Sequence, residues 1–292
     1  MKNGIVKRIK LKEGYEVYTN TVGHGKLPIL LLHGGPGGCS ECFEIMEEYL
    51  DLNQYSLIYY DQLGSYYSDS IEDENLLTLD RYVEEVEQVR QGLGLDRFVL
   101  LGHSWGGMLA VEYALKYRGL KALNGIVISN MTASNNSFEK SLAQRRKELL
   151  EPSELEYLEM IEAVGNYEDG RYKELVFGKL YSQCIFRGSE LPRFLSEDKL
   201  ARIVYKKFQG DNEFVVTGDL KDWDRWEDLK DIDVRTLVMG AQYDTMAVDD
   251  KKEMAGRIPN AELFICPDGS HFAYWDDSVN YFKGLNNFLD SL

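Results

Sequence analysis

The sequence has little proline, cysteine and histidine, and it contains no long apolar run. Its 292 residues include six prolines, four cysteines and four histidines. No stretch approaches the ~20 apolar residues that a membrane-spanning helix needs, so a transmembrane protein is not expected. Residues 1–18 alternate basic and apolar side chains and lack the continuous apolar segment of a signal peptide. We therefore expect a cytoplasmic protein.

Cysteine is too scarce for a disulfide scaffold in a chain of this length. Cys39 and Cys42 form a C-x-x-C spacing, which zinc sites and redox centres also use. No second cysteine or histidine pair stands at ligand spacing, and the histidines are scattered. We expect free thiols and no metal ion.

Basic residues are outnumbered by acidic ones. The 33 lysines and arginines face 49 aspartates and glutamates, which gives a formal net charge of −16. Nucleic-acid binding requires a basic surface, and so does attachment to an anionic membrane, so neither partner is expected. The acidic excess is spread along the whole chain, which indicates a solubility role and does not locate a site.

Short apolar runs alternate with helical periodicity over the first 130 residues. Four of these runs are typical of strands buried on both faces of a parallel sheet: 28–32, 55–60, 98–101 and 125–129. Residues 78–93 carry apolar side chains at helical spacing before Gly94, and a second helix is expected from Trp105 to about Tyr117. This alternation predicts an α/β fold with a mostly parallel sheet and crossover helices.

The periodicity changes after Asn130. Residues 131–230 show helical spacing and many charges but no buried strand run, and Ser153 followed by Glu156 predicts the start of one helix. Strand runs return at 236–240 and 262–266. We therefore expect a core made of 1–130 and 231–292, interrupted by a helical cap at 131–230. Such an insertion is expected over the carboxyl ends of the strands, where open parallel sheets bind ligands.

One motif in the core carries chemistry. Residues 102–106 read Gly-His-Ser-Trp-Gly, a G-x-S-x-G sequence between a predicted strand and a predicted helix. This context is that of a nucleophile elbow, in which a tight turn lifts the serine hydroxyl above the sheet. We predict that Ser104 is a catalytic nucleophile. The N-terminus of the following helix favours the negative charge that develops during attack.

A serine hydroxyl needs a base and an acid to become a good nucleophile. His271 follows the last predicted strand, and Asp244 follows the strand at 236–240. Asp249 and Asp250 are rivals for the acid, but both are interpreted as exposed residues at the start of the next helix. The chain order Ser104, Asp244, His271 is the order of an α/β-hydrolase.

The oxyanion needs two backbone N–H donors. Trp105, directly after the nucleophile, supplies one, and the glycine-rich loop at 33–38 supplies the other. A phosphate-binding loop is the rival interpretation of this loop, but the Walker lysine and the G-x-G-x-x-G spacing are missing. The predicted chemistry is hydrolysis of an ester or amide without metal or organic cofactor.

Several motifs together resemble the proline iminopeptidases, or prolyl aminopeptidases, which are serine exopeptidases of the α/β-hydrolase fold. They are HGGPGG, DQLGS, GHSWGGMLA, the NEF segment, GAQYDTM and GSH, and the resemblance runs from about residue 15 to the C-terminus. It implies that Ser104, Asp244 and His271 form the triad and that Gly35 and Trp105 hold the oxyanion. It also implies that Glu213 binds the free amino terminus of a short peptide.

The chain departs from the family pattern at two positions. Some relatives have proline where this chain has Asp211, and some have a second amine-binding glutamate where this chain has Thr245. The second half of the amine clamp is therefore unassigned. Two alternatives remain open, namely a serine esterase or lactonase acting on a small neutral molecule, and a binding or sensing protein with little turnover. The oligomeric state is not predicted.

Overall fold

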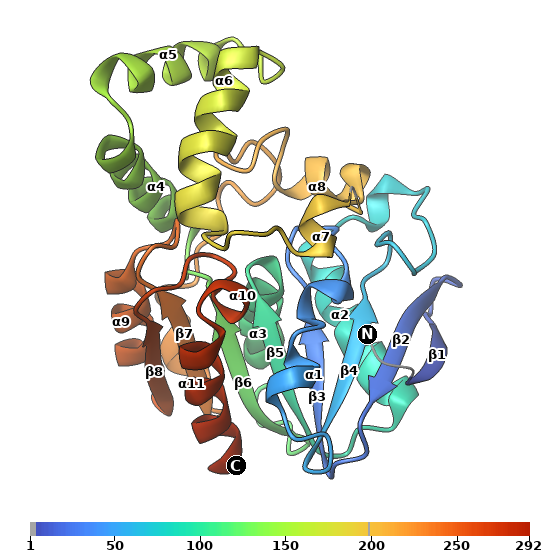
Figure 1. The fold of residues 1–292 in the computed structure, drawn as a ribbon. Helices are drawn as coiled ribbons and strands as arrows, with labels where there is room; N and C mark the ends of the chain where they lie inside the picture. The colour runs from blue at the N-terminus through green and yellow to red at the C-terminus, as the bar shows by residue number, and fades with distance from the viewer. Residues whose placement is uncertain (1–3, 198) are drawn as a thin grey trace.

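A single eight-stranded sheet forms the centre of the protein (Figure 1). The structure is a computed structural model that describes residues 4–197 and 199–292. Its strands are β1 (Ile5–Lys10), β2 (Glu16–Val22), β3 (Leu27–Leu32), β4 (Tyr55–Asp61), β5 (Phe98–His103), β6 (Leu123–Ser129), β7 (Thr236–Ala241) and β8 (Ala261–Cys266). The order is β1-β2-β4-β3-β5-β6-β7-β8. The β1–β2 and β2–β4 pairs are antiparallel and all other pairs are parallel, which confirms the predicted mostly parallel sheet.

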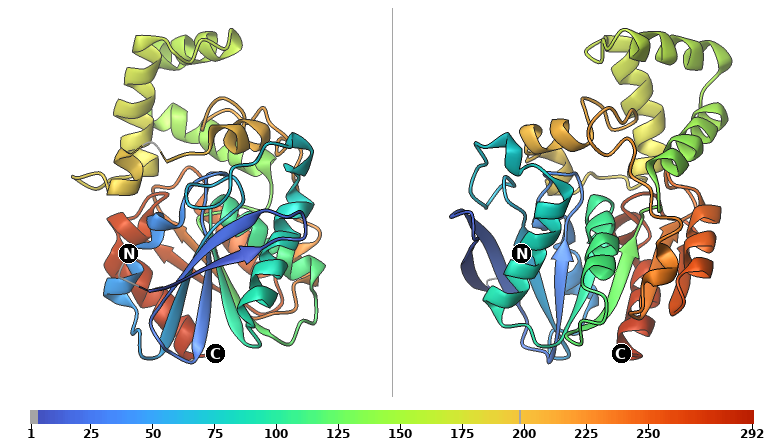
Figure 2. Two further views of the ribbon diagram at one scale, coloured as in Figure 1. Left: turned by 90° about the vertical axis from the view of Figure 1, so that its right-hand side faces the viewer. Right: turned by 180° about the vertical axis from the view of Figure 1, so that it is seen from behind.

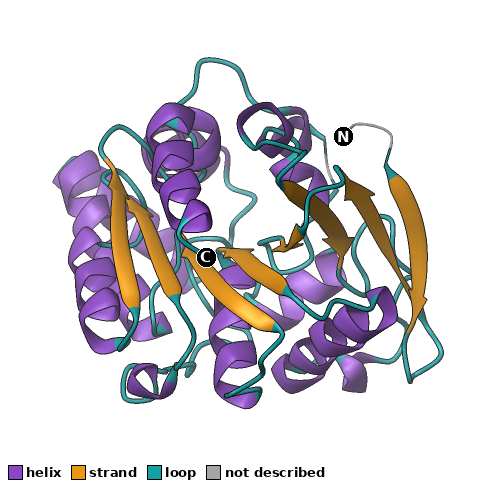
Figure 3. Cartoon of the chain, turned by 90° about the horizontal axis from the view of Figure 1, so that it is seen from below, coloured by secondary structure: helices purple, strands orange, loops and turns teal. Residues whose placement is uncertain are grey.

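Helices cover both faces of this sheet (Figures 2 and 3). One face carries α2 (Leu79–Leu93), α3 (Trp105–Lys116) and α9 (Val248–Arg257), and the other carries α1 (Met46–Tyr49) and α11 (Ser278–Asp290). The apolar side chains between sheet and helices form two clusters, one for each face. Because both faces are covered, the inner strands are apolar along their whole length, as the sequence runs indicate.

Local signals in the sequence define helix α2. The Thr78 hydroxyl accepts a 3.3 Å hydrogen bond from the backbone N–H of Arg81 and caps the first turn. Gly94 has a φ of 68° and ends the helix in the left-handed conformation that glycine adopts at little cost. Both ends of α2 therefore agree with the helix expected at residues 78–93.

Helices occupy the chain between β6 and β7 and lie above the carboxyl ends of the strands (Figure 1). We call them the inserted helices: α4 (Asn135–Leu149), α5 (Pro152–Ala163), α6 (Gly170–Leu175), the π-helical segment η3 (Val176–Ile185), α7 (Arg193–Ser196) and α8 (Arg202–Phe208). Helix α5 does not start where predicted. Glu151 and Glu154 form its capping box and Pro152 is its first residue, because proline suits a position whose N–H has no acceptor in the helix.

Four short 3₁₀ or α-helical turns complete the described elements, at η1 (Ser40–Phe43), η2 (Glu74–Leu76), η4 (Leu229–Asp231) and α10 (Ala273–Asp276). No helix within the described residues is both long enough and apolar enough to span a bilayer.

The sheet order places two loops side by side. Strand β3 lies between β4 and β5, so the chain leaves β3 toward one side and later returns to its other side. The loops that follow β3 and β5 therefore meet at the carboxyl edge of the sheet. Open α/β sheets bind ligands at such a reversal point.

Candidate active site

Ser104 occupies the sharp turn between β5 and α3. Its backbone has a φ of 55° and a ψ of −123°, a strained conformation for a residue with a side chain. The two flanking glycines make the turn possible. A Cβ on Gly102 would lie 1.9 Å from the carbonyl oxygen of Gly106, and a Cβ on Gly106 would lie 1.9 Å from that of Leu32. The G-x-S-x-G motif thus has the geometry of a nucleophile elbow.

His271 and Asp244 are joined by a hydrogen bond. His271 Nδ1 donates to Asp244 Oδ1 at 2.9 Å, and both side chains are buried. Burial disfavours the charged form of each group, but their mutual attraction is stronger, so the pKa of Asp244 is lowered and the pKa of His271 is raised. With its proton on Nδ1, the imidazole keeps Nε2 available as a base. His271 and Ser104 line the same cavity, whereas Asp244 lies behind His271.

Asn130 supports this pair, and sequence reasoning did not identify it. It follows β6 with a φ of 50°, and its side-chain amide donates to Asp244 Oδ2 at 3.0 Å and to the carbonyl oxygen of Ser270 at 3.1 Å. One buried amide thus connects the acid to the residue before the histidine. The only signal in the sequence is a polar residue directly after a buried strand.

The glycine-rich loop after β3 lies against Ser104. A Cβ on Gly34 would be 3.0 Å from the Cβ of Ser104, and Gly35 has a φ of 121°, which favours glycine. Trp105 is the first residue of α3, so its backbone N–H has no acceptor within the helix. Of the two predicted oxyanion donors, Trp105 directly follows Ser104, and Gly35 lines the same cavity as Ser104.

Gln62 connects the two segments that carry these donors. Its backbone N–H donates to His33 Nε2 at 3.2 Å, and its side-chain amide donates to the His33 carbonyl oxygen at 3.1 Å. The Gln62 amide oxygen accepts a 2.8 Å hydrogen bond from the Trp105 indole. All three residues are buried. Sequence reasoning noted DQLGS as a family motif but gave Gln62 no role.

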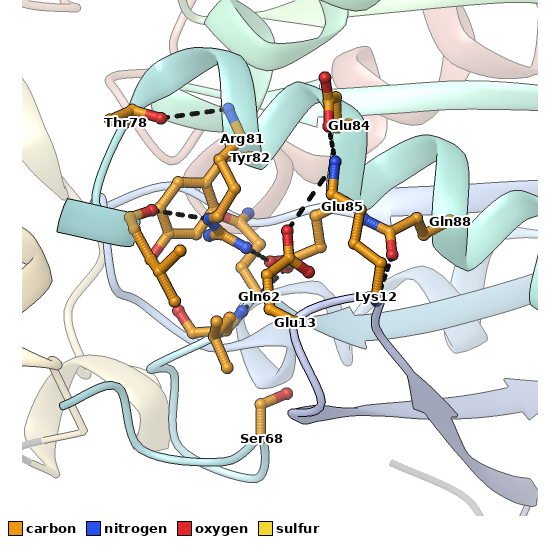
Figure 4. Close-up of polar contacts among 12 residues, drawn as sticks. Lys12, Glu13, Gln62, Ser68, Thr78, Arg81, Tyr82, Glu84, Glu85 and Gln88 are labelled. Atoms are coloured by element: carbon orange, nitrogen blue, oxygen red, sulfur yellow. Dashed lines mark hydrogen bonds and ion pairs between the residues drawn. The ribbon is translucent and has the colours of Figure 1, made fainter. Parts of the chain in front are cut away.

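A buried ion pair holds the loop that contains Gln62. The Glu85 carboxylate pairs with Arg81 on the same helix (Figure 4). It also accepts a 2.9 Å hydrogen bond from the backbone N–H of Leu63. Tyr60 also donates to this carboxylate. Helix α2 is thereby attached to the loop that follows β4.

A cavity of about 460 Å³ opens above Ser104. Glu213 lines it together with Tyr181 and Tyr205, and the Tyr205 hydroxyl donates to Glu213 Oε2 at 2.6 Å. Burial raises the pKa of Glu213, although Tyr205 and His271 oppose this shift. Glu213, which the family resemblance suggests as the amine-binding residue, therefore lines the same cavity as Ser104 and His271.

The two positions that depart from the family pattern do not line this cavity. Asp211 is exposed and pairs with Lys206 at 3.1 Å. Thr245 is buried, and its hydroxyl donates to Asp244 Oδ1 at 3.1 Å. Glu197 is the other carboxylate among the described lining residues, and it pairs with Lys199 at 2.7 Å.

Cys39 and Cys42 also line the cavity as free thiols. Burial raises the pKa of Cys39 to about 12 and raises the pKa of Cys42 as well. Both side chains are therefore neutral at physiological pH and act as small apolar groups in the wall.

The inserted helices contact the loop that contains His271 and the glycine-rich loop after β3. The backbone N–H of His271 donates to the carbonyl oxygen of Cys184 at 2.9 Å, at the end of η3. At the start of α8, the backbone N–H of Ala201 donates to the carbonyl oxygen of Gly37 at 2.8 Å. Residues of η3, α7 and α8 thus form part of the cavity wall.

Comparisons with known proteins agree with this architecture. A family model described as the alpha/beta hydrolase fold matches residues 28–278. The chain is 39% identical to a proline iminopeptidase of Elizabethkingia meningoseptica over 282 residues, 94% of each chain. It is 37% identical to a proline iminopeptidase of Flavobacterium johnsoniae over 271 residues, 91% of each chain. The crystal structure of a proline iminopeptidase from Mycobacterium smegmatis superimposes with a TM-score of 0.89 over 98% of both chains, at 24% identity, which speaks for the fold alone. The chain therefore belongs to the proline iminopeptidase family of the α/β-hydrolase fold.

Proposed function

We propose that this protein is a serine exopeptidase that releases the N-terminal residue, preferentially proline, from short peptides. The observation that carries the proposal is the position of Glu213 in the same cavity as Ser104 and His271. The names of the relatives support the preference for proline.

In the proposed mechanism, His271 takes the hydroxyl proton as Ser104 attacks the first peptide carbonyl. The backbone N–H groups of Gly35 and Trp105 stabilise the oxyanion. His271 then protonates the leaving amine, and water hydrolyses the acyl-enzyme. Asp244 holds the Nδ1 proton of His271 and stabilises the imidazolium, a role that the 2.9 Å hydrogen bond supports.

Selection of the amino terminus is assigned to Glu213. A free N-terminal ammonium pairs with this carboxylate, and a hydrogen bond to a charged group contributes about 1.5–3 kcal/mol. The Tyr205 hydroxyl fixes one carboxylate oxygen and leaves the other for the substrate. Tyr181 and Phe272, in the same cavity wall, supply apolar surface for a proline ring.

The proposed roles of the site residues divide the chain into a catalytic core and a cap. We infer that 1–130 and 231–292 form the catalytic core and that 131–230 forms a cap. The cap supplies Glu213 and Tyr205, and the core supplies the triad and the oxyanion donors. Removal of the cap is expected to abolish amine recognition.

The proposal is tested with proline β-naphthylamide and a matched series that varies the N-terminal residue. The proline compound should give the highest kcat/KM, and Ser104→Ala should reduce turnover to background. An uncharged fluorophosphonate should label Ser104 in the wild-type protein. Turnover that persists in Ser104→Ala, or a protein that leaves every aminoacyl naphthylamide intact, would contradict the proposal.

A further inference from the structure

A buried lysine lies behind the acid of the triad. Lys251, on α9, has no exposed side-chain surface, and its Nζ is 4.0 Å from Asp244 Oδ2. Its Nζ makes no hydrogen bond to any described residue, and burial lowers the pKa of Lys251 while Asp244 and Asp250 favour the charged ammonium. Lysine is almost never fully buried unless it is paired, so this position requires an explanation.

The fold makes room for this side chain. A Cβ on Gly240 of β7 would lie 2.6 Å from Lys251 Cγ, so a residue with a side chain there would collide with the lysine stem. Lys252, the next residue, is exposed and pairs with Asp249 at 2.9 Å. The two adjacent lysines therefore have different environments, and only Lys251 points at the triad.

The two oxygens of Asp244 have separate partners. Oδ1 accepts hydrogen bonds from His271 and Thr245, whereas Oδ2 accepts one from Asn130 and faces the Lys251 ammonium. The positive charge therefore lies on the side of the carboxylate away from the imidazole. It favours the ionised acid without competing for the oxygen that His271 uses.

We propose that Lys251 is a positioning residue for Asp244, a buried ammonium that keeps the acid ionised and sets the lower pH limit of Ser104 reactivity. The proposal rests on the proposed serine mechanism but not on amine recognition. Without this positive charge, the negative charge of Asp244 should act more strongly on His271. The imidazole should therefore bind its second proton more tightly.

Other titratable groups also act on the triad or on Lys251, and each belongs to a different element. His103 of β5, Arg145 of α4 and Glu213 after α8 act on the triad, and Asp250 of α9 acts on Lys251. Asp244 and Glu213 raise the pKa of His271 against the effect of burial, whereas Lys251 lowers it. Loss of the Lys251 charge is therefore expected to raise the pKa of His271.

The test measures the rate of Ser104 modification by an uncharged fluorophosphonate as a function of pH. This probe carries no amine, so its binding does not require an ion pair with Glu213. The rate should fall at low pH as His271 becomes protonated. In Lys251→Met, the pH at which the labelling rate falls to half its maximum should be higher by about 0.5–1 pH unit. Lys251→Arg, which keeps the charge, and Lys252→Met should retain the wild-type limit.

The melting temperature sets the conditions of this test. Removing one member of a buried ion pair leaves the other charge uncompensated, so Lys251→Met should melt below the wild-type temperature, and the pH profiles are measured at a temperature at which both proteins are folded. If that variant does not fold, Lys251→Gln carries the same test. If the pH below which Ser104 labelling slows is unchanged or lower in Lys251→Met or Lys251→Gln, the proposed role of Lys251 is wrong. Failure of the wild-type protein to label at Ser104 would overturn the serine mechanism and this inference together.

Discussion

The side-chain amide of Asn130 donates a 3.0 Å hydrogen bond to Asp244 Oδ2, and it also reaches the Ser270 carbonyl oxygen. Asn130 therefore joins the loop that bears the acid to the loop that bears the histidine. The backbone of Asn130 has a positive φ, so glycine is the replacement that removes the amide without adding strain.

Asn130→Gly is expected to lower kcat by about 10–100-fold, because a hydrogen bond to a charged group contributes about 1.5–3 kcal/mol. KM should change little, because Asn130 does not line the cavity. Steady-state kinetics with proline β-naphthylamide measure both constants. Asn260→Gly removes an exposed amide and serves as the control. A kcat that stays at the wild-type value would show that Asp244 and His271 need no support from this residue.

Glu213→Gln is expected to raise KM for a free-amine substrate by about 10–100-fold, since a neutral amide replaces the charged partner of the ammonium. Its hydrogen-bond partner Tyr205 should still accommodate the amide. Asp211→Asn, which alters a nearby exposed carboxylate, is the matched control and should leave KM unchanged. If both variants behave alike, Glu213 is not the amine-binding group.

The Glu213 carboxylate also predicts a pH effect on KM. Burial raises the pKa of Glu213, so the ionised form is lost as the pH falls through a value above that of an ordinary glutamate. KM of the wild-type enzyme should therefore rise as the pH is lowered through this range. KM of Glu213→Gln should be high and flat over the same range, and a parallel rise in the variant would assign the effect to another group.

Gln62→Met is expected to reduce kcat by about tenfold or more while KM stays similar. The substitution leaves the Trp105 indole and the His33 carbonyl oxygen without their partner, and an unsatisfied buried polar group costs about 1–3 kcal/mol. Trp105→Phe removes the same hydrogen bond from the other side. In a double-mutant cycle, the two effects should be less than additive. Full additivity would mean that the hydrogen bond between them does not support the oxyanion donors.

Glu85→Gln is expected to destabilise the fold by about 3–5 kcal/mol, because it leaves the buried Arg81 guanidinium without its anionic partner. Glu84→Gln alters a half-buried carboxylate on the same helix that pairs with Lys12 and Lys116, and it should cost about 0–1 kcal/mol. Urea unfolding of both variants gives the comparison. Equal losses would show that burial does not distinguish the two ion pairs.

The parts of the fold that the sequence predicts depend on local pattern. The apolar run at 98–101 and the flanking glycines of Ser104 define a strand and a turn without reference to distant residues. The chain order of Ser104, Asp244 and His271 then places three side chains at one edge of a parallel sheet.

The supporting residues could not be predicted in this way. Asn130 and Asp244 are 114 positions apart, and Gln62 and Trp105 are 43 positions apart, so their hydrogen bonds depend on the complete sheet order. Lys251 and Lys252 are chemically identical neighbours in a charged helix. Only the packing of α9 on Gly240 buries one and exposes the other.

The most direct test of the account compares proline β-naphthylamide with its N-acetylated form in one assay. The two compounds share the scissile bond and the ring, and only the first carries the ammonium that Glu213 is proposed to bind. The account predicts efficient hydrolysis of the free compound and about a 10–100-fold lower kcat/KM for the acetylated one, since a charged partner contributes about 1.5–3 kcal/mol. Equal rates on both compounds would contradict it.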